Sequence, residues 1–134
     1  MKSLPLKKVL LSNAAFSALT GLILIVDHQS IALLMGAHPA WIYLTLGVGL
    51  CIFALDVGFV ATRNKINKTW AKMILAADIS WVAGSAALIA FGQSFLSNQA
   101  NILILVIGLL VAIFSFLEYQ FIVNNDNTVE AYVA

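Results

Sequence analysis

Residues 41–61, WIYLTLGVGLCIFALDVGFVA, form a run of mostly apolar side chains with a single charged residue, Asp56. An α-helix rises about 1.5 Å per residue, so a run of this length crosses the roughly 30 Å hydrocarbon core of a bilayer. Working outward, three further stretches have a similar length and character: residues 9–26, 71–91 and 102–123. The sequence therefore predicts four membrane-spanning helices.

The composition of the chain excludes an ordinary water-soluble domain. Of its 134 residues, 62% are hydrophobic and only 10% are charged, whereas soluble domains carry about 25% charged residues. Four spans use most of the chain, and in lipid each helix satisfies its own backbone hydrogen bonds. The expected fold is an all-α integral membrane protein, a single domain over residues 1–134 in which four transmembrane helices form an up-and-down bundle.

Two segments outside the spans carry separate expectations. The connection before the second span contains SIALLMGAHP, residues 30–39, which is apolar for a water-facing loop. We expect a short helix at the membrane surface, although an early start of the second span would also explain this composition. The polar tail, residues 124–134, has no apolar periodicity and is expected to be frayed.

The positions of the basic residues predict the orientation of the bundle. All seven lie near two boundaries of the spans: Lys2, Lys7, Lys8, Arg63, Lys65, Lys68 and Lys72. Because lysine and arginine favour the cytoplasmic side of a membrane, both termini are expected in the cytoplasm, and the protein is expected in the inner (plasma) membrane of a bacterium. Topology explains these clusters, so they give no reason to expect a nucleic-acid partner.

One polar residue in each span lies at a similar depth. These residues are Asn13, Asp56, Asp78 and Glu118. Measured along the helix axis, each lies roughly 7 to 11 Å from the end of its span on the expected cytoplasmic side. Carboxylates inside a membrane rarely face lipid and usually face the bundle interior or a wet cavity. The four residues are therefore predicted to form one layer that faces inward.

The third span adds two neighbours to this layer. Asp78, Trp81 and Ser85 share one face of their helix by spacing, which predicts a polar pocket, open toward the cytoplasm, where Trp81 and Ser85 contact the organic part of a ligand. Several carboxylates in a poorly hydrated site cannot all stay ionised at low cost, so they are expected to share protons or hold a cation. The predicted function is binding or transport of protons, a cation or a small amphipathic ligand.

A structural interpretation of the same residues stays open. The acids could pair with Lys8, Arg63 or Lys72, whose long side chains can bend inward, and then only fix the register of the helices. The protein would in that case be a non-catalytic accessory or scaffold protein, as a homo-oligomer or with a partner membrane protein.

Enzyme chemistry finds little support in the sequence. Motifs of nucleophilic hydrolases, zinc proteases and phosphate-binding loops are absent, and no span contains a histidine to serve as a base. Both histidines, His28 and His38, fall in one connection with Asp27 as the only nearby carboxylate, which is not a typical metal-ligand set. We expect no catalytic residues, no metal and no cofactor, although two facing acids could in principle perform aspartyl chemistry.

Overall fold

The computed structural model describes residues 4–36, 38–63, 66–94 and 96–123, and within these ranges the chain is entirely helical apart from short connections. The expected tail, 124–134, lies outside the described residues. The helices are α1 (Leu4–Val26), α2 (His28–Met35), α3 (Ala40–Thr62), α4 (Lys68–Phe91) and α5 (Asn98–Val123). Four of them, all except α2, are long and apolar enough to span a membrane, which agrees with the predicted number of spans.

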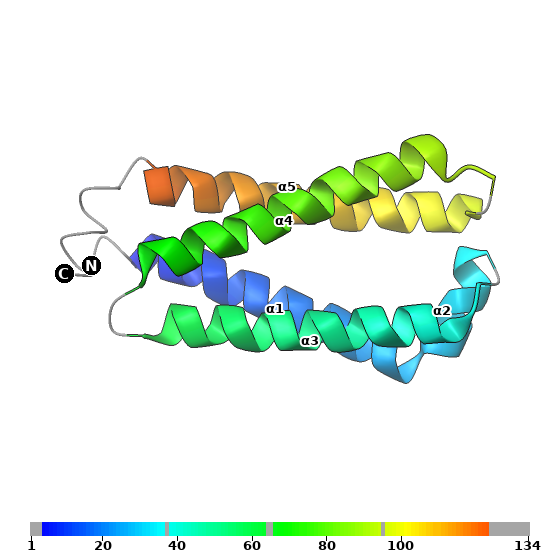
Figure 1. Cartoon of the computed structure of the whole chain (residues 1–134), viewed down its shortest axis with the longest axis horizontal. Coiled ribbons are helices and arrows are strands. Elements are labelled where there is room, and N and C mark those ends of the chain that lie inside the picture. Colours follow the sequence, from blue (N-terminus) through cyan, green and yellow to red (C-terminus); the bar gives the residue numbers. More distant parts are fainter. Residues whose placement is uncertain (1–3, 37, 64–65, 95, 124–134) are drawn as a thin grey trace.

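The long helices form two packed pairs that run up and down between the ends of the bundle (Figure 1). One pair is α1 with α3, and the other is α4 with α5. The start of α1 and the end of α5 lie at one end, which we call the terminal end, and α2 lies at the opposite end, the α2 end (Figure 1). The two pairs meet mainly through α1 and α5, whereas α3 and α4 approach each other near the terminal end and diverge toward the α2 end (Figure 1).

Two glycines allow α1 and α3 to cross closely. A Cβ atom built on Gly21 of α1 would lie 2.8 Å from the carbonyl oxygen of Gly47 and 2.8 Å from Cys51 Sγ, both on α3. A Cβ atom on Gly47 would lie 2.7 Å from the carbonyl oxygen of Gly21. Because lipid gives helices no hydrophobic drive to associate, such close backbone contact supplies much of the attraction between spans.

The connection between α1 and α3 contains the expected short helix, α2. The helix follows a break at Asp27 and stops at Gly36, whose φ of 134° is favoured only by glycine. Ser97, in the connection between α4 and α5, binds the end of α2: its Oγ donates to the carbonyl of Leu34 at 2.6 Å, and its N–H donates to the carbonyl of Met35 at 3.1 Å. These bonds join the two helix pairs at the α2 end.

The terminal end of the bundle is closed by apolar side chains. A buried cluster fills the space between the helices there and consists of Leu6, Leu10, Val57, Val60, Ala61, Ile66, Ala71, Ile74, Leu75 and Ile122. Its members come from α1, α3, α4, α5 and the connection between α3 and α4. Polar side chains from α1, α4 and α5 lie next to this cluster, toward the middle of the bundle.

Candidate functional site

The side-chain amide of Asn13 joins two acidic residues from different helices. Its Nδ2 donates to Asp78 Oδ2 at 2.6 Å and to Glu118 Oε2 at 2.9 Å, while its Oδ1 accepts a bond from Ser17 Oγ at 3.2 Å. All of these side chains are buried; Glu118 is 0% exposed and Asp78 is 4% exposed. Three of the four residues predicted for the polar layer therefore meet at one point, which we call the carboxyl cluster (Asn13, Asp78 and Glu118).

The charges of the carboxyl cluster are not offset by a basic side chain in the described part of the chain. Asp78 and Glu118 interact with each other and with Asn13, and no lysine or arginine is among their partners. Lys8 and Lys72 are exposed, and the Arg63 guanidinium lies 4.4 Å from the centre of the Phe59 ring. The alternative in which these bases neutralise the buried acids is thus not the arrangement that the structure has.

One oxygen of the carboxyl cluster has no hydrogen-bond donor. Glu118 Oε1 is buried and unpartnered, and the two carboxyl groups lie side by side because Asn13 Nδ2 donates to one oxygen of each. A hydrogen bond between two carboxyl groups requires a proton on one of them. The geometry therefore accommodates one proton shared by the two acids.

Asp56, which the sequence placed in the same layer, is not brought to the carboxyl cluster. Its side chain is exposed on the outside of α3, whereas the adjacent Val57 is 0% exposed and faces the interior. Asp56 instead borders a separate cleft at the terminal end, together with Phe59, Val60, Arg63, Asn67 and Trp70. Successive helical residues point about 100° apart, and α3 turns Val57 inward in place of its neighbour.

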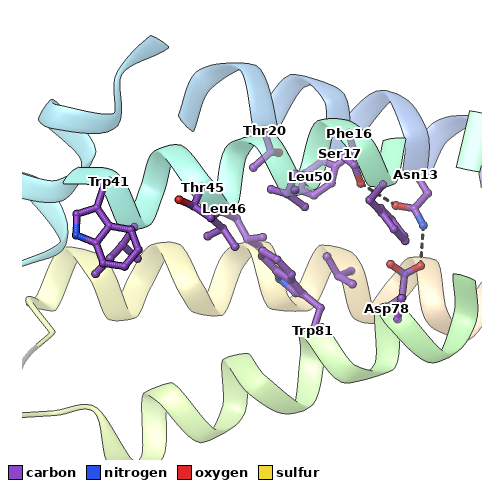
Figure 2. Close-up of a pocket in the computed structure, with 16 residues that line it drawn as sticks. Asn13, Phe16, Ser17, Thr20, Trp41, Thr45, Leu46, Leu50, Asp78 and Trp81 are labelled. Carbon is purple, nitrogen blue, oxygen red and sulfur yellow. Dashed lines mark hydrogen bonds between the residues drawn. The ribbon is translucent and has the colours of Figure 1, made fainter. Parts of the chain in front are cut away.

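A cavity of about 520 Å³ begins at the carboxyl cluster and lies between all four long helices. Asp78 and Asn13 are at one end of it and Trp41 is at the other (Figure 2). We call this the central cavity; it is lined by Asn13, Phe16, Ser17, Thr20, Trp41, Ile42, Thr45, Leu46, Gly49, Leu50, Phe53, Ala77, Asp78, Trp81, Ile107 and Val111. Its volume is in the range of small-molecule sites, about 300 to 1,000 Å³.

The direction of the central cavity differs from the expected one. The sequence predicted a pocket open toward the end that holds the termini, but the apolar cluster around Leu10 and Val57 closes that end. The cavity extends from Asp78 toward the α2 end instead, where α3 and α4 diverge (Figures 1 and 2). The reason is that the apolar residues at the terminal end pack together, so the polar layer is sealed on that side.

The two neighbours predicted from the third span have different positions. Trp81 points from α4 into the central cavity (Figure 2), and its Nε1 is buried without an acceptor. Ser85 does not line the cavity: its Cβ lies 3.3 Å from the position of a Cβ built on Gly108 of α5, so it packs at the contact between α4 and α5.

The sequence analysis missed Thr45 as a lining residue. Thr45 brings a hydroxyl to the wall that α3 contributes, and Thr20 brings another from α1 (Figure 2). Gly49 also lines the cavity, and a Cβ atom there would meet nothing within 4 Å. Thr45 was detectable as a hydroxyl in an otherwise apolar half of its span, but the sequence does not tell which face of that span is inside.

The histidines of the connection lie apart from this site. His38 Nδ1 is 2.8 Å from the hydroxyl of Tyr43, and His28 Nδ1 is 2.8 Å from the carbonyl oxygen of Ile25. Within the described ranges, no group of three or more histidine, cysteine, aspartate or glutamate side chains could hold a metal ion.

No protein family, curated protein or solved structure matches this chain. The residues of the site form an elongated apolar chamber with one carboxyl group, that of Asp78, and the amide of Asn13 at its closed end. The buried Glu118 accepts a hydrogen bond from the same amide.

Proposed function

We propose that this protein binds a small amphipathic molecule in the central cavity, with the polar end of the molecule against Asp78. The observation that carries the proposal is the position of a buried carboxyl group, without a basic partner in the described residues, at the closed end of a large apolar chamber. Ligand sites typically combine apolar walls with a few convergent polar groups.

The packing of the helices supports access from the bilayer. The walls of the cavity are mostly aromatic and aliphatic, and both α3 and α4, which diverge toward the α2 end (Figure 1), contribute to them. A molecule dissolved in the hydrocarbon region could pass between these helices without crossing water. Thr20 and Thr45 provide hydroxyl groups along the way to Asp78 (Figure 2).

The carboxyl cluster is proposed to hold one proton when no ligand is bound. Two ionised carboxylates around one amide would be strongly unfavourable at this depth, whereas a single shared proton leaves only one negative charge in the cluster. The interacting pair then titrates as a unit and not as two independent acids.

We further propose an orientation with both termini in the cytoplasm, in the inner membrane of a bacterium. The basic residues that the structure describes lie at the terminal end of the bundle, on α1, α4 and the connection before α4, as the positive-inside tendency favours. They are Lys7, Lys8, Arg63, Lys68 and Lys72. In this orientation the central cavity extends from the carboxyl cluster toward the outer face.

Photolabelling in a lipid bilayer tests the binding proposal. Two decyl probes, one an alcohol and one a trimethylammonium, each carry a diazirine on the chain and are added to protein in nanodiscs. We expect labels on the peptides that contain Leu46 and Ile107, which line the cavity.

A pair of glycine variants on α3 provides the matched comparison. Gly49→Leu adds a side chain inside the cavity, whereas Gly58→Leu adds the same side chain outside it, and a Cβ atom meets nothing within 4 Å at either position. Labelling of the cavity peptides should fall at least several-fold in Gly49→Leu and stay at the wild-type level in Gly58→Leu. Equal labelling in both variants would refute a ligand in this cavity and favour the accessory or scaffold role.

A further inference from the structure

We infer that the polar end of the ligand is an organic cation, and that this cation exchanges with the proton of the carboxyl cluster. The inference rests on the proposed function and names the class of molecule that the same cavity takes. The inference depends on which donors and acceptors of the carboxyl cluster already have hydrogen-bond partners.

The donors of the cluster are occupied. Asn13 Nδ2 has two hydrogens, and its two acceptors are Asp78 Oδ2 and Glu118 Oε2. The hydroxyl of Ser17 donates to Asn13 Oδ1. What remains at the closed end is acceptor capacity: the carboxylate of Asp78, which lines the cavity, and the unpartnered Oε1 of the fully buried Glu118. A ligand head that brings donors or positive charge is therefore the complementary one.

The wall next to Asp78 favours the same charge. Trp81 lies one helical turn from Asp78 and also lines the cavity. The face of an indole ring attracts a cation, and aromatic walls beside an acidic group are a common way to bind organic ammonium ions. The unpartnered Nε1 of Trp81 is satisfied by an acceptor on the same ligand or by water.

A divalent inorganic cation fits this site poorly. Hard cations such as Ca²⁺ need six to eight oxygen ligands, and Mg²⁺ needs six. The central cavity presents one carboxylate and a few hydroxyls among apolar side chains. The lining from Trp41 to Phe53 extends roughly 18 Å along α3, which suits a cation with a long or bulky hydrocarbon part.

The exchange conserves the charge of the site. Two carboxyl groups that share one proton carry one negative charge. When an organic cation binds at Asp78, the proton leaves for water and two carboxylates remain beside one positive charge, so the total is again one negative charge. The polar layer thus never has to hold two uncompensated charges inside the membrane.

Calorimetry with a matched pair of probes tests the cation and the exchange separately. One probe is decyltrimethylammonium, and the other is its neutral analogue with a tert-butyl carbon in place of the ammonium nitrogen. The permanent charge means that no proton comes from the probe. Titrations of wild-type protein in nanodiscs are run in two buffers of different ionisation enthalpy, which yields both the affinity and the number of protons released, with empty nanodiscs as the background.

We expect the cation to bind at least about tenfold more tightly than the neutral analogue, the size of a charge-assisted contact, and to release up to one proton. Asp78→Asn should make the two affinities equal. Glu118→Gln should keep the preference for the cation but abolish proton release, because Asp78 is then the only acid present. Asp56→Asn, which removes an acid outside the cavity, should behave as wild type.

The outcomes separate the two proposals. Equal affinity of wild-type protein for both probes would overturn the cation class while leaving an amphipath-binding cavity intact. A preference for the cation without proton release would overturn the exchange. If neither probe binds above the empty nanodiscs, the binding proposal and this inference both fail. Because the decisive ratio is measured on wild-type protein, a variant that does not fold leaves the test valid.

Discussion

Asn13 and Asp78 are separated by 65 positions in sequence, and their side chains are joined by a hydrogen bond of 2.6 Å between Nδ2 and Oδ2. The bond connects α1, from the first helix pair, to α4, from the second. Since the same nitrogen also binds Glu118 on α5, one uncharged side chain holds together three of the four spans in the half of the bundle nearer the terminal end.

Replacing Asn13 alone should destabilise the bundle. Asn13→Leu leaves two buried carboxyl groups without their shared donor, and we expect a loss of about 2–4 kcal/mol in the free energy of unfolding. Ser17→Ala removes only one neutral hydrogen bond and should cost about 0.5–1.5 kcal/mol. Unfolding of the purified protein in mixed micelles, as the fraction of denaturing detergent rises, measures both.

Removing the whole carboxyl cluster should restore part of the stability that Asn13→Leu alone loses. In the triple variant Asn13→Leu, Asp78→Leu, Glu118→Leu no buried acid is left without its donor. Only the hydroxyl of Ser17 loses its acceptor, as it does in Asn13→Leu, so the triple variant should be more stable than Asn13→Leu alone. A triple variant that is less stable than the single one would show that the acids stabilise the bundle independently of Asn13.

A protonated carboxyl group should be detectable in the folded protein. If Asp78 and Glu118 share a proton, the infrared spectrum of the wild-type protein at neutral pH contains the C=O stretching band of a carboxylic acid, which appears in the difference between wild type and variant. Either Asp78→Asn or Glu118→Gln should remove this band, since neither remaining acid has a carboxyl partner. Asp56→Asn is the control, and a band that disappears only in that control would assign the proton to the exposed acid.

A Cβ atom added at the crossing of α1 and α3 should destabilise the folded protein. Gly47→Ala places a Cβ atom 2.7 Å from the carbonyl oxygen of Gly21, and separating the two helices should cost about 1–3 kcal/mol. Gly58→Ala, on the same helix with no atom within 4 Å, should be neutral or stabilising by up to about 1 kcal/mol. Comparable losses in both variants would mean that general helix propensity, and not the close crossing, determines the outcome.

The proposed orientation can be read from the labelling of single cysteines in intact cells. The background is Cys51→Ser, which removes the native thiol. Gln29→Cys lies on α2 and Thr69→Cys lies at the start of α4, both at exposed positions at opposite ends of the bundle. A membrane-impermeant maleimide should label position 29 and spare position 69 until the cells are opened. The reverse pattern would place the termini outside.

Several features were determined by sequence composition and spacing. The apolar runs predicted four spans, and the helices α1, α3, α4 and α5 contain them, because the hydrophobic thickness of a bilayer fixes the length that an apolar helix needs. The ends moved by a few residues where local chemistry acts, as at Asn67, whose Oδ1 accepts from the N–H groups of Thr69 and Trp70 and starts α4 at Lys68. Depth along each helix also followed from counting residues, which is why Asn13, Asp78 and Glu118 were expected at one level.

Rotation about each helix axis was decided only by the tertiary structure. A span that is apolar on all sides has no stripe to show which face is inside, so Asp56 was assigned to the interior when it lies on the surface. The close contact of Gly21 with Gly47 fixes how α1 meets α3, and this contact turns Val57, Gly49 and Thr45 inward. The divergence of α3 from α4 then leaves the cavity on the α2 side of the carboxyl cluster. The sequence determined the depth of each polar side chain in its span, because depth depends on the rise per residue. Packing between helices determined which surroundings each side chain faces, because rotation depends on contacts between distant segments.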